Sequence, residues 1–192
     1  MEVQSAQREV REVFLGGAVG QAVSGLIWLL SAALGTWVST RYAILTLALL
    51  GALIFPLTQL VIRSMGRKAS LSKDNPLNAL AMQVAFIVPL NLPVIAAATL
   101  YRENWFYPAF MLVLGTHYMP FIFLYGMKLF GLLAAVLIGG GVMIGMYLSE
   151  SFVLGGYFTA LVLLGYAVLA WSTGAGRQTS AQPHEGSTQA DR

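Results

Sequence analysis

Six long runs of apolar residues, separated by short polar segments, make up most of the chain. They lie near residues 14–37, 42–63, 78–100, 105–126, 128–149 and 152–172. About 20 apolar residues are enough for an α-helix to cross the hydrocarbon core of a bilayer, and these runs are apolar on all sides. The pattern therefore predicts an all-α fold, namely a polytopic membrane protein with a bundle of six transmembrane helices.

The two ends of the chain depart from this pattern. Within residues 1–13, valine and alanine recur at helical spacing among charged residues, which predicts a cytoplasmic interfacial segment. Residues 173–192 are too polar to pack and are predicted to form a disordered cytoplasmic tail that contains His184. The segment between them, residues 14–172, is the predicted six-helix transmembrane domain.

Composition supports a membrane protein. The 192 residues are 57% hydrophobic and 10% charged, with a mean hydropathy of +0.72, whereas soluble domains average about 25% charged residues. The chain has no cysteine, which excludes a disulfide, a thiolate nucleophile and a cysteine metal site.

The basic residues are distributed unevenly between the two sides of the predicted bundle. Nine of the eleven Lys and Arg residues lie on the side that carries both termini: Arg8, Arg11, Arg63, Arg67, Lys68, Lys73, Lys128, Arg177 and Arg192. Only Arg41 and Arg102 lie on the other side, near a cluster of Trp, Tyr and Phe. The positive-inside rule and the aromatic belt therefore predict cytoplasmic termini and location in the cell (inner) membrane. The net charge of +3 forms no basic stripe with interleaved aromatics, so nucleic acid is not an expected partner.

His117 is the one ionisable side chain, other than tyrosine, that falls well inside a predicted span, and it lies between Thr116 and Tyr118. An intramembrane ionisable group usually faces protein or water. His117 is therefore interpreted either as a proton-switchable gate or ligand contact, or as a neutral histidine that joins two helices by a hydrogen bond.

Polar side chains also occur in the first three spans. In the third span Asn91 lies between Pro89 and Pro93, and each proline frees a backbone carbonyl one turn earlier. This is either a broken-helix binding site or a kink. Gln21, Gln59 and Gln83 lie one in each of the first three spans; they either line a polar vestibule or make separate hydrogen bonds between helices.

Two further features have structural explanations. Gly16, Gly20 and Ser24 repeat every four residues, as do Gly141 and Gly145, a spacing that lets helices approach closely. The basic loop with Arg63, Arg67, Lys68 and Lys73 sets topology and is a possible site for anionic lipid head groups.

Enzyme interpretations lack the necessary residues. All eight acids lie outside the spans, so no intramembrane carboxylate pair is expected. One intramembrane histidine is too few for a metal or haem site. We expect no enzyme activity, no metal and no cofactor.

Several short motifs carry a resemblance to a known group of proteins. They are Phe14-Leu-Gly-Gly-Ala-Val-Gly-Gln, Val23-Ser-Gly-Leu-Ile-Trp, Phe55-Pro56, Asn75-Pro76-Leu77 and Trp105-Phe-Tyr-Pro108. With these motifs the chain resembles an uncharacterised family of small bacterial multi-pass integral membrane proteins. The resemblance implies no activity and no catalytic residue.

These observations lead to a functional hypothesis. The protein is expected to bind or pass a small solute or lipid through a polar seam, with His117, Tyr118 and Asn91 at mid-depth and the three glutamines at the inner mouth. The alternative is a non-catalytic accessory subunit whose glycine faces bind another membrane protein, and a less favoured one is an intramembrane enzyme. Because six short spans leave little room for a conduit, a homodimer is expected.

Overall fold

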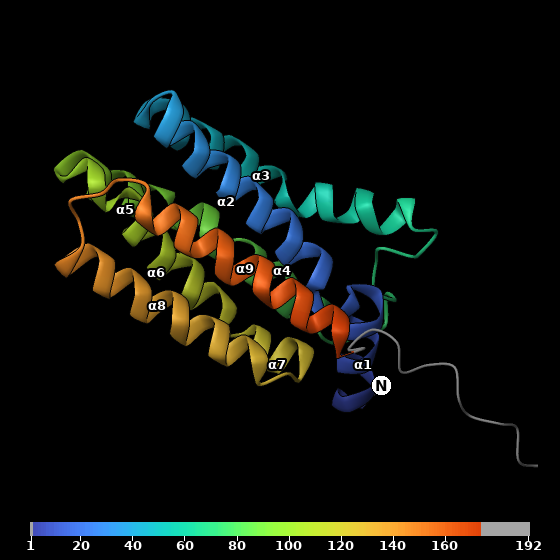
Figure 1. Ribbon diagram of the computed structural model, residues 1–192. Helices are drawn as coiled ribbons and strands as arrows, with labels where there is room; N and C mark the ends of the chain where they lie inside the picture. Colours follow the sequence, from blue (N-terminus) through green and yellow to red (C-terminus); the bar gives the residue numbers. More distant parts are fainter. Residues whose placement is uncertain (1, 174–192) are drawn as a thin grey trace, which may run out of the picture.

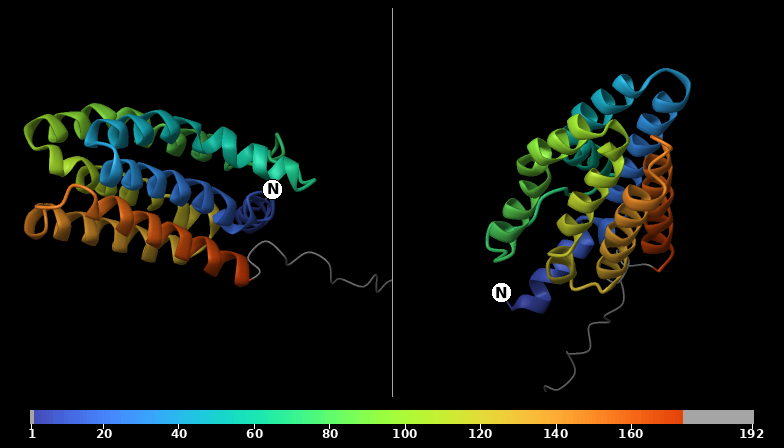
Figure 2. Two further views of the ribbon diagram at one scale, coloured as in Figure 1. Left: turned by 45° about the horizontal axis from the view of Figure 1, so that its top comes forward. Right: turned by 90° about the vertical axis from the view of Figure 1, so that its left-hand side faces the viewer.

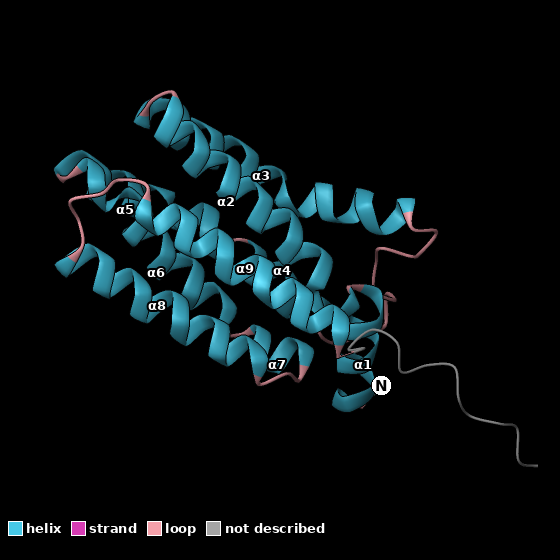
Figure 3. Ribbon diagram, in the orientation of Figure 1, coloured by secondary structure: helices cyan, strands magenta, loops and turns pink. Residues whose placement is uncertain are grey.

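The computed structural model describes residues 2–173, and this part of the chain is helical without any strand (Figure 3). Five helical segments are long and apolar enough to cross a membrane: Leu15–Trp37, Thr40–Ser64, Asn78–Tyr101, Leu129–Tyr147 and Leu154–Ser172. The protein therefore has the architecture of a multi-pass membrane protein. The predicted tail, including His184, Arg177 and Arg192, lies outside the described residues, except for Thr173, which ends the last helix in a turn.

The predicted span 105–126 does not form a single long helix and is not among the five candidate spans, so the expectation of six spanning helices is wrong by this measure. After the short turn η2 (Glu103–Trp105), α6 covers Phe106–Tyr118 and α7 covers only Phe121–Tyr125. Pro120 separates the two helices because it cannot donate a backbone hydrogen bond to the carbonyl of Thr116; that carbonyl accepts from the N–H of Met119 instead, at 3.2 Å. Together, α6 and α7 still return the chain along the length of the bundle (Figure 1).

The third predicted span is interrupted as well, although it remains one candidate span. It consists of α4 (Asn78–Ala85) and α5 (Ile87–Tyr101), which meet at a turn at Phe86. Pro89 lies three residues beyond this turn and removes the donor for the carbonyl of Ala85. Pro93, by contrast, is accommodated inside α5.

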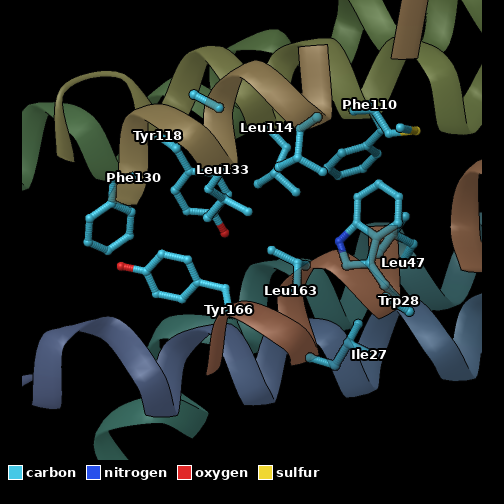
Figure 4. Close-up of a cluster of buried hydrophobic side chains, with 14 of the residues drawn as sticks. Ile27, Trp28, Leu47, Phe110, Leu114, Tyr118, Phe130, Leu133, Leu163 and Tyr166 are labelled. Atoms are coloured by element: carbon cyan, nitrogen blue, oxygen red, sulfur yellow. The ribbon is translucent and has the colours of Figure 1, made fainter. Parts of the chain in front are cut away.

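The main packing contacts of the bundle involve five helices. The chain enters through η1 (Leu15–Gly17), and α2 (Ala18–Trp37) then packs against α9 (Leu154–Ser172) and α3 (Thr40–Ser64), while α6 packs against α8 (Leu129–Tyr147). Buried apolar and aromatic side chains fill the space between them (Figure 4). Trp28 contacts Phe110 edge-on, and Phe130 contacts Tyr166, with ring centroids 5.2 and 4.9 Å apart.

The edge of the bundle is much less covered than its centre. Within an apolar stretch of 18 residues in each candidate span, only 11% of the residues are buried in α3 and 11% in α4–α5. In the first candidate span, Leu15–Trp37, the share is 56%. Figure 2 shows α4 and α5 at the periphery of the bundle. Large apolar surfaces of these helices are therefore left for lipid or for another protein chain.

The first helix, α1 (Val3–Val13), lies across the end of the bundle where α9 also ends (Figure 1). Its Ala6 and Val10 are buried. The Gln7 side chain donates to the carbonyl of Phe123 at 2.6 Å, and the Arg11 guanidinium donates to the carbonyl of Tyr125. Helix α1 is thus attached to the C-terminal end of α7.

The other side of α1 holds the long loop between α3 and α4. The Glu9 carboxylate accepts hydrogen bonds from the Ser72 N–H, the Ser72 hydroxyl and the Asn75 amide, and Arg67 donates to the carbonyl of Glu12. Partial burial raises the pKa of Glu9, but these hydrogen bonds outweigh it and hold the pKa below its ordinary value of 4.5.

Candidate functional site

His117 joins two helices. Its Nδ1 lies 3.1 Å from the carbonyl oxygen of Val84, in the last turn of α4. Because a carbonyl oxygen can only accept, Nδ1 must carry the proton for this contact to be a hydrogen bond. The imidazole also contacts the ring of Phe121, with centroids 4.9 Å apart. This geometry matches the interpretation of His117 as a link between α6 and the break in the third span.

Tyr118 and Gln21 form the most enclosed polar contact among the predicted site residues. The Tyr118 hydroxyl donates to the Gln21 Oε1 at 2.7 Å, and both residues are 4% exposed. Ser24 lies beside the same hydroxyl but outside hydrogen-bonding geometry. The contact connects α6 with α2 deep in the bundle, and Tyr118 packs against Phe130 (Figure 4).

The other three predicted polar residues do not join this pair. Asn91 donates to the carbonyl of Ile87 in its own helix, at 2.8 Å. Gln59 donates to the carbonyl of Ala69 in the α3–α4 loop, at 3.4 Å. Gln83 is exposed on α4. The structure therefore joins Gln21 to Tyr118, places the His117 ring 5.3 Å from the Tyr118 ring, and leaves Asn91, Gln59 and Gln83 at separate locations.

The small residues predicted for helix packing face neighbours within the same chain. A Cβ added at Gly141 would lie 3.1 Å from the Met111 Cβ, and one at Gly145 would lie 3.2 Å from the Pro108 Cβ, so α8 approaches α6 closely here. Gly20 faces Thr58 of α3 at 3.8 Å. Gly16 lies in η1 with a φ of 63° and accepts a hydrogen bond from Tyr166 through its carbonyl. These faces are occupied inside the monomer.

A groove that the sequence reasoning missed runs along α3. Its volume is about 330 Å³, and it is lined by Leu53, Pro56, Leu57, Gln59, Leu60 and Arg63. Pro56 lies inside α3, and the helix changes direction partway along its length (Figure 1). A proline inside a helix whose last turn carries an arginine is the sequence signal that could have indicated it.

The lining of the groove changes from apolar to polar along the helix. The Leu53 and Leu60 side chains are 46% and 63% exposed. The Gln59 amide and the exposed Arg63 lie toward the end of α3, where the basic loop begins. Three other basic residues of that loop, Arg67, Lys68 and Lys73, are exposed too. The groove thus combines an apolar lining with a cationic end.

Comparison with known proteins gives one match. The model of a family of unknown function, DUF7010, matches residues 3–173. This agrees with the resemblance to an uncharacterised family. No curated protein and no solved structure matches the chain.

Proposed function

Since the chain belongs to the DUF7010 family, whose function is unknown, we propose from its geometry that it binds an anionic amphiphile, of the phospholipid kind, along the groove of α3. The acyl part lies against the leucines, and the head group lies at Arg63. The proposed role is binding, without catalysis and without a cofactor.

The observation that carries the proposal is the order of the groove residues along α3. From Leu53 to Arg63 the helix rises about 15 Å, which is half of the roughly 30 Å hydrocarbon core of a bilayer. The distance from the apolar start of the groove at Leu53 to its cationic end at Arg63 therefore matches the depth of one leaflet. The guanidinium end then falls at head-group level, where Arg binds phosphate oxygens in a bidentate manner.

The hydrogen bonds inside the bundle favour binding at this surface over passage through a polar seam. Gln21 and Tyr118 satisfy each other, and the Asn91 amide is bonded to its own helix. A conduit needs polar groups that are free to exchange partners with a solute. In this proposal Gln21 and Tyr118 hold α2 and α6 together, and His117 links α6 to the break between α4 and α5.

The orientation in the membrane is part of the proposal. We infer that α6 and α7 cross the bilayer together as a sixth, broken crossing, so that both ends of the chain face the cytoplasm of a bacterial cell. The positive-inside rule supports this orientation. It puts Arg63 and the basic loop beside the cytoplasmic leaflet, where anionic lipids attract juxtamembrane Lys and Arg at roughly 1 kcal/mol each.

Two pairs of variants test the proposal, with lipid binding read by native mass spectrometry during titration with phosphatidylglycerol. Leu60→Trp fills the groove, whereas Leu49→Trp adds the same side chain at a similarly exposed position outside the groove lining (63% and 66% exposed). Arg63→Gln removes the cationic end, whereas Arg41→Gln removes a charge at the opposite end of α3.

We expect Leu60→Trp and Arg63→Gln each to reduce the fraction of lipid-bound protein severalfold, and the two controls to leave it unchanged. Phosphatidylcholine, which has no net charge, should bind less than phosphatidylglycerol, and Arg63→Gln should abolish this preference. Equal losses in both members of a pair would contradict a site at this groove.

A further inference from the structure

The break between α4 and α5 leaves polar groups on two sides of a membrane-spanning segment. Between Gln83 and Pro89 the helix is interrupted at Phe86, and Pro89 cannot donate to the carbonyl of Ala85. Polar groups within the hydrocarbon core are costly unless protein or water satisfies them. The question is therefore what satisfies each side of the break.

The inner side is satisfied within the chain. Val84 is 2% exposed, and its carbonyl accepts the hydrogen bond from His117 Nδ1. This contact joins the break to α6. The bundle therefore completes the hydrogen bonding only on the side of α4 that faces it.

The outer side has no such partner. Gln83 and Ala85, the two neighbours of Val84, are both exposed. Gln83 is the sixth residue of the candidate span Asn78–Tyr101, which places its amide about 7 Å from the start of the span. The Gln83 carboxamide is therefore an exposed polar group of a candidate span, and no hydrogen bond joins it to the described part of the chain.

Large apolar side chains are exposed before, at and after the break. Met82, Phe86, Leu90 and Val94 follow one another at four-residue intervals and are 63%, 53%, 73% and 60% exposed. Such i±4n rows are the ridges by which helices pack against one another. The ridge belongs to the peripheral α4–α5 segment seen in Figure 2, so it is free to contact another chain.

We propose that this ridge, Met82, Gln83, Phe86, Leu90 and Val94, is the interface of a homodimer in which Gln83 pairs with Gln83 of a second copy. A carboxamide is self-complementary, because its NH₂ donates and its oxygen accepts. A two-fold axis brings identical patches face to face. Two glutamines close to that axis therefore satisfy each other by reciprocal hydrogen bonds, a result that lipid acyl chains cannot provide.

The occupant is a second copy because the Gln83 carboxamide, the polar group exposed at the break, is complementary to itself. The proposal is independent of lipid binding at α3, since none of the ridge residues lines that groove. Failure of either proposal leaves the other standing.

The absence of cysteine from the chain permits a direct test in native membranes. Gln83→Cys places a single thiol near the proposed axis, and Met143→Cys places one on α8, at a residue that is 61% exposed. A disulfide requires Cα atoms about 4.4–6.8 Å apart. Under mild oxidation we expect a covalent dimer from Gln83→Cys and monomer from Met143→Cys.

A second measurement addresses the amide itself. Protein labelled with donor or acceptor dyes is reconstituted in liposomes at decreasing protein-to-lipid ratios. The fall in energy transfer between copies then gives the dimer dissociation constant. Loss of two reciprocal hydrogen bonds in Gln83→Leu should raise it about five- to tenfold, whereas Thr116→Val, which removes an exposed hydroxyl of α6, should leave it unchanged. No cross-linking of Gln83→Cys above that of Met143→Cys, or tighter association of Gln83→Leu, would overturn the proposal.

Discussion

At the scale of single residues, the polar side chains of the membrane segments serve mainly to connect helices. The Tyr118 hydroxyl and the Gln21 amide are the clearest case, because both are almost fully buried and bonded to each other. Removing one partner leaves the other buried and unsatisfied, which costs about 1–3 kcal/mol.

The Tyr118→Phe variant tests this role. We expect it to lower the free energy of unfolding by about 1–2 kcal/mol, since the Gln21 oxygen loses its donor while ring packing is kept. Tyr147→Phe, at a residue that is 80% exposed, provides the control. Reversible unfolding in mixed micelles measures both, and equal stability of the two variants would contradict a structural role for the hydroxyl.

At the scale of elements, α1 depends on the turn between α7 and α8. Gly126 has a φ of 62°, and a Cβ there would lie 2.6 Å from the Gln7 Oε1. Gly66 has a similar φ of 73°, but its Cβ would meet no atom within 4 Å. Substitution of either glycine should therefore strain the backbone to a similar extent. Only a substitution at Gly126 would also disturb the contact with α1.

Substitution of these glycines by alanine separates the two effects. Both variants should lose about 1–2 kcal/mol of stability because alanine disfavours the left-handed conformation. Only Gly126→Ala should also displace the Gln7 side chain, whose hydrogen bond to the carbonyl of Phe123 helps to hold α1. We expect faster tryptic cleavage at Arg8 and Arg11 in Gly126→Ala than in Gly66→Ala. Identical cleavage rates would show that α1 does not depend on this turn.

The contact between α1 and the α3–α4 loop should also respond to pH. The Glu9 pKa is lower in the folded protein than its ordinary value, so the carboxylate contributes stability above pH 4.5 that is lost as the pH falls through the folded pKa. After correction for the pH dependence of the intrinsic exchange rate, the protection of α1 amides against hydrogen exchange should therefore fall only below pH 4.5. Glu9→Gln should remove this dependence, whereas Glu2→Gln, before the start of α1, should keep it.

At the scale of the whole molecule, hydrophobic periodicity predicted the helical class and most of the helices. It failed at Pro120, because a proline permits either a kink or an end, and the choice depends on packing. Pro56 and Pro93 are kept inside α3 and α5, whereas Pro120 separates α6 from α7.

The polar contacts were harder to predict than the helices. Gln21 and Tyr118 are 97 positions apart in the chain, and nothing in the sequence favours that pair over Gln21 with Asn91 or His117. The groove was missed for a similar reason, since it depends on the shape of one bent helix. The sequence showed which polar residues lie inside the spans. Which of them contact one another is determined by the fold.

The attachment of α1 has a consequence for biosynthesis. Gln7 and Arg11 bond to carbonyls of residues 123 and 125, which leave the ribosome more than 110 residues later. Helix α1 must therefore wait for residues 123 and 125 to be synthesised and inserted before it reaches its final position. Until then its buried face, with Ala6 and Val10, is open to chaperones and to the membrane surface.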